Sequence, residues 1–278
     1  EEMKIELEPK IPTRRYIGTE GLFSRKEHLE DVEVSPWTLP DDDAIVIGPN
    51  CNNPWRVRGP VGMSAMSFGA LGENAISSIS YGLGKATGSW VHTGEGGLAP
   101  YHTIGGGDVI MQIGSGIFGV RNQDGTFSWE KFQEKADNPQ LRCFEIKLAQ
   151  GAKIRGGHVE GSKVNEEIAA IRGVKPWKTV DSPNRHNQFN DLPSLFDFID
   201  KLRDKGGKPI GIKIVMGGAD SADELAKYMS ETGRGPDYIT VDGSEGGSGA
   251  TYQEMADTMG IPIKSGLIYC DNALRKYG

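Results

Sequence analysis

The chain has 278 residues and a formal net charge of −7, which disfavours nucleic acid as a partner because a phosphate backbone repels negative charge. No apolar run approaches the roughly 18 residues that a membrane-spanning helix needs. The three widely spaced cysteines favour reduced thiols in a cytoplasmic protein over a disulfide framework, and the five histidines lack the spacing of metal ligands, so no metal site is predicted.

Composition divides the chain into two regions. Residues 1–59 are polar, interrupted by prolines and without a hydrophobic period, and we expect them to form an N-terminal extension that packs over another unit. From residue 60 onward, short apolar runs alternate with amphipathic segments, which is typical of parallel βα units. Residues 60–278 are therefore predicted to form an α/β domain.

The first half of the α/β domain contains three short predicted strands, at residues 61–65, 89–92 and 109–113. A helix of about four turns is predicted after the first strand, from the helical spacing of Ala75, Ile76, Ile79 and Leu83. The second strand leads into a glycine loop that carries Glu95. This carboxylate either contacts a substrate or a catalytic ammonium, or is a solvated loop residue.

A glycine motif at residues 114–119 formally matches G-x-G-x-x-G. The dinucleotide-binding fingerprint requires a helix that opens at the motif, whereas residues 120–125 are typical of a turn. We therefore expect a loop here rather than a dinucleotide site.

The strongest predicted strand covers residues 143–149 and separates apolar from charged side chains. Its apolar face consists of Phe144, Ile146 and Leu148. Glu145 and Lys147 lie on the opposite face, and a charged pair there must enter a polar site or be paired. Two cations and an amide follow within residues 150–157, which favours a dicarboxylate or phosphate ligand, with a solvated basic loop as the alternative.

The second half of the domain repeats this pattern. A helix is predicted over residues 191–205, with a buried stripe of Leu195, Phe198, Ile199 and Leu202. The strand at 210–215 places Lys213 opposite its isoleucines, where this lysine either faces a polar site or forms a structural ion pair. For Lys147, Glu145 is a candidate partner in such a pair. The remaining predicted elements are a helix at 221–232, a strand at 238–241 and a helix at 266–276.

These segments amount to about six βα units and favour a (β/α)8 barrel of the TIM type over a doubly wound sheet. Because such a barrel has two more units, either the chain is a fragment or another part supplies the last two strands. Loops at the carboxyl ends of barrel strands build the active site. The glycine-dense loop at 241–250 suits an anionic or planar cofactor, and with the loop at 93–97 it suggests convergence on one site.

Four motifs carry a resemblance to a known family. They lie at residues 64–71, 93–97, 145–153 and 242–250. Together they resemble the FMN-binding (β/α)8 barrel domain of glutamate synthase, most closely the stand-alone glutamate synthase-related proteins, over about residues 60–275. Any one motif is weak, whereas four in the same order are specific.

The resemblance implies an oxidoreductase acting on CH–NH2 groups in glutamate biosynthesis, in which reduced FMN converts 2-iminoglutarate, formed from 2-oxoglutarate and ammonia, to L-glutamate. The implied flavin contacts are Ser64, Ala65, Met66, Lys147, Lys213, Glu245, Gly246 and Gly247. The implied 2-oxoglutarate contacts are Glu95, Gln150, Lys153 and Arg172.

The same resemblance implies catalytic roles for three of these residues, Glu95, Lys147 and Lys153. Glu95 would help to transfer the proton of the imine or ammonium group. Lys147 would stabilise the negative charge of a reduced flavin. Lys153 and Arg172 suit the two carboxylates of the substrate.

The chain also departs from the family pattern, which leaves the substrate open. Residues 154–158 are one residue shorter than in the family, and residues 182–186 replace its Ser-Pro-Pro segment. The loops that grip the flavin phosphate, the cysteines of an iron–sulfur centre and the glutaminase domain do not appear before Gly278. The resemblance thus implies an iron–sulfur cluster only in the complete enzyme, an electron-donor subunit or ferredoxin, an amidotransferase or amine-donating subunit, and an oligomer.

Two alternatives stay open. A subunit of an N-methylglutamate-forming enzyme would use methylamine in place of ammonia. A non-catalytic scaffold subunit would keep the barrel within a larger flavoenzyme complex. The incomplete flavin site favours the scaffold, whereas the joint presence of Glu95, Lys147, Lys153 and Arg172 disfavours it.

Overall fold

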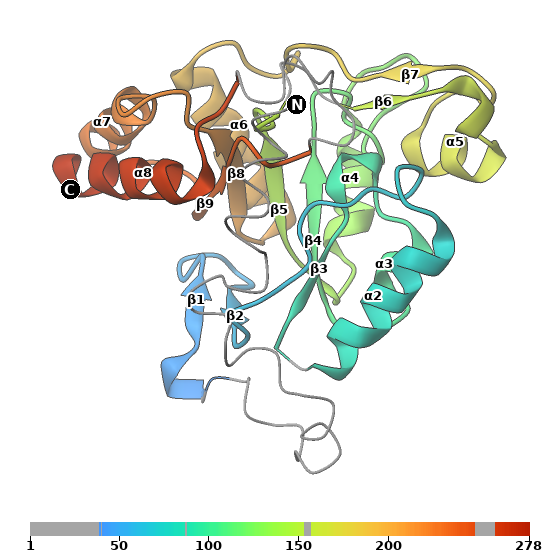
Figure 1. Cartoon of the computed structure of the whole chain (residues 1–278), viewed down its shortest axis with the longest axis horizontal. Coiled ribbons are helices and arrows are strands. Elements are labelled where there is room, and N and C mark those ends of the chain that lie inside the picture. The colour runs from blue at the N-terminus through green and yellow to red at the C-terminus, as the bar shows by residue number, and fades with distance from the viewer. Residues whose placement is uncertain (1–38, 40, 87, 153–156, 248–258) are drawn as a thin grey trace, which may run out of the picture. The chain divides into compact units, whose positions relative to one another are not determined.

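A five-stranded parallel sheet organises the chain (Figure 1). The computed structural model describes residues 39, 41–86, 88–152, 157–247 and 259–278, which belong to one compact unit, Trp37–Gly278. In spatial order the strands are β3 (Trp90–His92), β4 (Asp108–Ile113), β5 (Leu141–Lys147), β8 (Ile210–Val215) and β9 (Tyr238–Asp242). All neighbours pair in parallel, so their carboxyl ends meet at one edge of the sheet.

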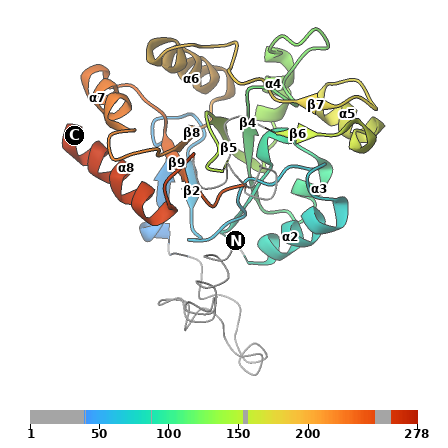
Figure 2. The same ribbon diagram turned by 45° about the horizontal axis from the view of Figure 1, so that its top comes forward.

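Helices connect these strands and lie around the curled sheet (Figure 2). They are α2 (Glu73–Lys85), α3 (Pro100–Thr103), α4 (Trp129–Ala136), α5 (Glu166–Arg172), α6 (Leu192–Gly206), α7 (Asp223–Thr232) and α8 (Ile263–Tyr277). Short 3-10 turns are η3 (Asp41–Asp43), η4 (Gly94–Gly96) and η5 (Gly161–Lys163). The fold is a partial α/β barrel, so the predicted TIM-barrel class is confirmed. Among the described helices, none has the length and apolar character needed to cross a membrane.

Strands β5 and β8 pack against helix α6 to form the centre of the main core. Ile146 of β5, Ile212 of β8 and Phe196 of α6 are fully buried, and burying a side chain of this size contributes roughly 1.5–3 kcal/mol. Helix α6 begins where the carboxylate of Asp191 accepts a hydrogen bond from the Ser194 N–H group at 2.8 Å. The predicted stripe is buried as expected, at Leu195, Phe198, Ile199 and Leu202.

Two strand predictions need correction. Residues 61–65 form no strand: the Met63 N–H group donates to the Trp90 carbonyl at 2.9 Å, but no ladder follows. Gly62 lies against the Trp90 ring, which a Cβ atom at this position would overlap, so the segment packs on a side chain rather than pairing with β3. The prediction that Leu148 belongs to the apolar face of this strand is also wrong, because β5 ends at Lys147 and Leu148 is 37 % exposed.

Several short elements were not predicted. They include two antiparallel strand pairs, one of β1 (Ile45–Ile47) with β2 (Trp55–Val57) and one of β6 (His158–Val159) with β7 (Val180–Asp181). Within the segment predicted to be aperiodic, Trp55 packs against Ile110 and Cys143 of the sheet. Helices α4 and α5 are only 8 and 7 residues long, too short to show a clear apolar period.

Candidate functional site

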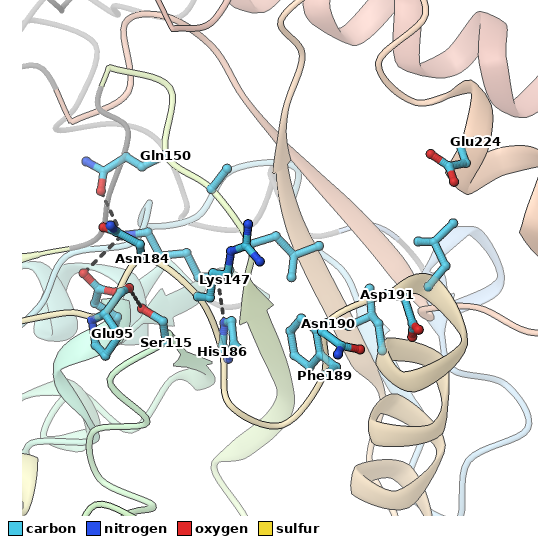
Figure 3. A pocket seen from close by; sticks show the side chains of 16 residues that line it. Glu95, Ser115, Lys147, Gln150, Asn184, His186, Phe189, Asn190, Asp191 and Glu224 are labelled. Carbon is cyan, nitrogen blue, oxygen red and sulfur yellow. Dashed lines mark hydrogen bonds and ion pairs between the residues drawn. The ribbon is translucent and has the colours of Figure 1, made fainter.

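Three polar side chains meet at the carboxyl edge of the sheet. Glu95 lies in η4 after β3, Lys147 ends β5, and Gln150 follows it. The Lys147 Nζ atom is 3.2 Å from Glu95 Oε1 and 2.8 Å from Gln150 Oε1. The side chains of Glu95 and Lys147 are each 9 % exposed. All three residues line a cavity of about 580 Å³, a volume typical of small-molecule sites (Figure 3).

The Glu95 carboxylate is fitted into the backbone around it. Its Oε1 atom accepts a hydrogen bond from the Gly157 N–H group at 2.5 Å. A Cβ atom at Gly157 would lie 2.7 Å from Oε1, and one at Gly114 would overlap Oε2. Glu95 is therefore a buried, paired group, which excludes the alternative of a solvated loop residue.

The first glycine of the G-x-G-x-x-G motif thus makes room for Glu95. Its second glycine, Gly116, packs on the Phe118 ring, which a Cβ atom would contact at 2.5 Å. The motif folds as a turn, with the Ile117 N–H group donating to the Gly114 carbonyl at 2.9 Å, and no helix opens there. The expectation of a loop is confirmed.

The segment between β7 and α6 supplies the other wall of the cavity (Figure 3). His186 lies under Lys147: its Nε2 atom is 3.0 Å from the Lys147 carbonyl, and its ring stacks on Phe189 at 4.7 Å. Burial lowers the pKa of His186, which keeps the ring neutral. Arg185 also lines the cavity and is exposed, and no ion pair of this side chain occurs among the described residues.

These wall residues were not predicted as site residues. Asn184, Arg185 and His186 belong to the segment at 182–186, whose departure from the family pattern was the available sequence signal. Ser115, whose hydroxyl donates to the Pro183 carbonyl, had no signal besides its neighbouring glycines.

A second cavity, of about 350 Å³, lies against β3, β4, β8 and β9. Of the predicted flavin contacts, Ser64, Ala65 and Lys213 line this cavity, whereas Met66 does not. Its wall is mainly apolar, with Met63, Trp90, Ile110 and Val241 among the lining residues. Lys213 forms an ion pair with Asp242, with 3.4 Å between Nζ and Oδ2.

A buried polar cluster centred on Glu145 of β5 borders the second cavity. Its Oε1 atom is 3.1 Å from His92 Nε2 and accepts from Gln112 Nε2 at 2.6 Å, while Oε2 accepts from the Thr240 hydroxyl at 2.5 Å. Burial would raise the pKa of this carboxyl, but His92 and the hydrogen bonds from Thr240 and Gln112 hold it at about 2. Glu145 is therefore ionised. Its hydrogen bonds run to neither lysine, so the alternative in which Lys147 pairs with Glu145 is not what the structure shows; Lys147 pairs with Glu95 instead.

Arg172 lies behind Glu95 rather than in the cavity wall. Its Nη2 atom donates to the Phe68 carbonyl at 3.1 Å, and its guanidinium lies 5.2 Å from the centre of the Phe118 ring. Burial lowers the pKa of Arg172, while Glu95 acts in the opposite direction. The described conformation thus directs Arg172 toward the protein interior. Lys153 lies outside the described residues.

The glycine loop after β9 approaches the same segment as Glu95. A Cβ atom at Gly247 would overlap the Gln150 side chain, and the Gly246 carbonyl accepts from the Ala152 N–H group at 3.0 Å. Glu245 accepts from the Ile263 N–H group at 3.1 Å, so its carboxylate caps the start of α8. The two glycine loops therefore converge on residues 147–152, as expected. Residues 248–250 of the predicted loop lie outside the described residues.

Comparison with known proteins gives a consistent family relationship. The family model described as a conserved region in glutamate synthase matches residues 13–278. The chain is 52% identical over 280 residues to the glutamate synthase large subunit-like protein YerD of Bacillus subtilis (strain 168), covering 100% of the chain and 53% of that relative. It is 30% identical over 270 residues to the archaeal-type glutamate synthase (NADPH) of Thermotoga maritima, covering 95% of the chain and 47% of the relative. The chain thus spans about half the length of these curated relatives.

Proposed function

The chain belongs to the glutamate synthase family, and we propose that its Glu95–Lys147–Gln150 site takes part in forming L-glutamate from 2-oxoglutarate and ammonia. The observation that carries this proposal is the buried Lys147–Glu95 pair in the wall of the 580 Å³ cavity. An ammonium and a carboxylate held 3.2 Å apart can act together on a substrate: the ammonium stabilises negative charge, and the carboxylate accepts or donates a proton.

The proposed reaction needs proton transfer at one carbon centre. Ammonia adds to the keto carbon of 2-oxoglutarate, and loss of water leaves 2-iminoglutarate. Addition of a hydride to the imine carbon and a proton to nitrogen then gives glutamate. We propose that Glu95 handles the protons on nitrogen, and that Lys147 stabilises negative charge beside it.

The substrate carboxylates need cationic or amide partners. Gln150 and Arg185 line the same cavity as Glu95, and Arg185 has no ion pair among the described residues. We propose that these two side chains bind carboxylate groups, together with Lys153. Arg172, held behind Glu95, then supports the carboxylate of Glu95 electrostatically instead of contacting the substrate.

The second cavity fits the ring system of a flavin. A flavin ring requires apolar walls with a few polar groups, and here Trp90, Ile110 and Val241 accompany Lys213. We propose that Ser64, Ala65 and Lys213 hold FMN there. When bound and reduced by the electron donor, FMN would supply the hydride. The ion pair with Asp242 would keep Lys213 in place.

The source of electrons and ammonia lies beyond this site. The Thermotoga maritima relative is named as an NADPH enzyme. For this chain we propose an electron-donor subunit or ferredoxin, an amine-donating subunit and a cytoplasmic location.

The test uses the full-length protein loaded with FMN and reduced without oxygen. We expect 2-oxoglutarate with ammonium to restore the oxidised flavin spectrum and yield glutamate. Faster reoxidation with methylamine would identify the N-methylglutamate reaction instead. Failure to bind FMN, or no response to either amine, would overturn the proposal and favour a scaffold role.

A matched pair of variants localises the chemistry. Glu95→Gln should slow reoxidation by about 10²–10⁴-fold, the usual range for a general acid or base. Glu130→Gln, an exposed carboxylate on α4, should leave the rate unchanged. Equal rates for both variants would remove Glu95 from the reaction.

A further inference from the structure

The buried ring of His92 connects the Glu145 cluster with the turn that carries Glu95. Its Nδ1 atom lies 3.2 Å from the Gly94 nitrogen, and its Nε2 atom lies 3.1 Å from Glu145 Oε1. A backbone N–H group can only donate, so Nδ1 must carry a lone pair. The ring then carries a proton on Nε2 and donates it to Glu145.

Glu145 is placed to enforce this arrangement. Three side chains from three other strands of the sheet surround its carboxylate: His92 of β3, Gln112 of β4 and Thr240 of β9. An ionised carboxylate accepts hydrogen bonds and offers none. His92 must therefore present N–H to Glu145, which leaves Nδ1 free to accept from Gly94.

Gly94 determines where Glu95 lies. Its φ of 60° begins the η4 turn, and a Cβ atom here would lie 2.7 Å from the Ser67 nitrogen. Glu95 is the next residue, and its Oε1 atom is 3.2 Å from Lys147 Nζ and 2.5 Å from the Gly157 nitrogen. A displacement of the Gly94 amide would move the carboxylate away from both partners.

We propose that His92 and Glu145 are positioning residues, which orient Glu95 through the hydrogen bond from Gly94 to the His92 ring. This inference rests on the proposed function, in which Glu95 handles protons. Both residues also border the second cavity. Each ring nitrogen of His92 has a hydrogen-bond partner: Nε2 bonds to Glu145, and Nδ1 bonds to Gly94.

Two substitutions at His92 separate positioning from stability. The amide oxygen of Asn can replace Nδ1 as an acceptor for Gly94, whereas the amide nitrogen of Gln can replace Nε2 as a donor to Glu145. We expect His92→Gln to lower kcat by about 10–100-fold, as removal of an outer orienting group typically does, with the KM for 2-oxoglutarate within about 3-fold. We expect His92→Asn to keep kcat within about 3-fold but to melt at a lower temperature, because Glu145 loses a donor.

The opposite order would overturn the proposal. If His92 only stabilised the fold, activity would follow stability, and His92→Asn would be the more impaired variant in both measurements.

Two readouts do not depend on the reaction. In His92→Gln the Gly94 amide should exchange its hydrogen about 3–10-fold faster, the effect of losing one hydrogen bond. In the unsubstituted protein, labelled with ¹⁵N-histidine, His92 should be neutral with its proton on Nε2. A proton on Nδ1, or unchanged exchange at Gly94, would overturn the positioning role even if glutamate is formed. A protein without activity that passes both tests would instead overturn the proposed function.

Discussion

The Lys147–Glu95 ion pair should contribute more to stability than any exposed pair of the same chain. Both partners are 9 % exposed, and removing one partner of a buried pair typically costs about 3–5 kcal/mol, because the other charge is left without compensation. Here we expect Lys147→Met and Glu95→Gln each to cost about 3 kcal/mol, at the low end of that range. The reason is that both side chains border a cavity that water can enter.

The interaction itself is measured by a double-mutant cycle. The double variant should be more stable than the sum of the single effects predicts, with a coupling energy of about 1–3 kcal/mol. Urea unfolding followed by circular dichroism gives the four free energies of unfolding. Lys227 and Glu231 provide the control, because they are 3.7 Å apart but about 60 % exposed. Their coupling should be about 0.3–0.5 kcal/mol.

The outcome that contradicts this reasoning is a coupling in the site no larger than that of the control pair. Solvent would then screen Lys147 and Glu95 as effectively as two surface residues. The cavity would be too open to strengthen electrostatic interactions, and the proposed charge stabilisation by Lys147 would lose its physical basis.

Three further predictions test other parts of the structure. Arg185→Gln should raise the KM for 2-oxoglutarate by about 10–100-fold with little change in kcat, because a hydrogen bond to a charged group contributes about 1.5–3 kcal/mol; an unchanged KM would place the carboxylates elsewhere. Gly157→Ala should abolish most activity while the protein stays folded, because the added Cβ atom would lie 2.7 Å from Glu95 Oε1 and displace the carboxylate; a crystal structure of this variant with Glu95 unmoved would contradict the fit. The Glu145 carboxyl has a folded-state pKa of about 2, below its ordinary value of 4.5, so its stabilisation is complete above pH 4.5 and is lost as the pH falls toward 2. Acid unfolding of Glu145→Gln should therefore show about 3 kcal/mol less loss of stability over that interval than the unsubstituted protein, and identical acid profiles would contradict this assignment.

The central strands and the longer helices could be predicted from the sequence because local patterns determine them. The alternating isoleucines of β8 and the helical spacing of apolar residues in α6 both identify the face that joins the main core. Parallel βα order then places all strand ends at one edge, which is why convergence of the glycine loops on one site could be expected. The pairing of Lys147 with Glu95 was not predicted, because the sequence pointed to Glu145 as the partner of Lys147.

Long-range contacts determine the rest of the site, and these have no periodic signal. Arg172 suits a carboxylate by its charge, yet the described fold holds it against Phe68 and Phe118. Arg185 and His186 occupy a connection without a hydrophobic period, and contacts with residues distant in the sequence bring them to the cavity. The contact of the His186 Nε2 atom with the Lys147 carbonyl, at 3.0 Å, is such a contact.

The glycine-rich loops lie around Glu95 and Gln150, as their sequence suggested. Their glycines make room for these two side chains, whereas the sequence suggested that they make room for a ligand. Gly114 and Gly157 are needed because a larger residue would collide with the carboxylate of Glu95, and Gly247 is needed because a larger residue would collide with Gln150. Here glycine admits the protein's own polar side chains against the backbone, where N–H groups can bind them. In the proposed reaction, a carboxylate fixed in this way would already be oriented before the substrate binds, so little reorganisation would remain at the moment of proton transfer. Enlarging any of these glycines should therefore damage catalysis more than the fold.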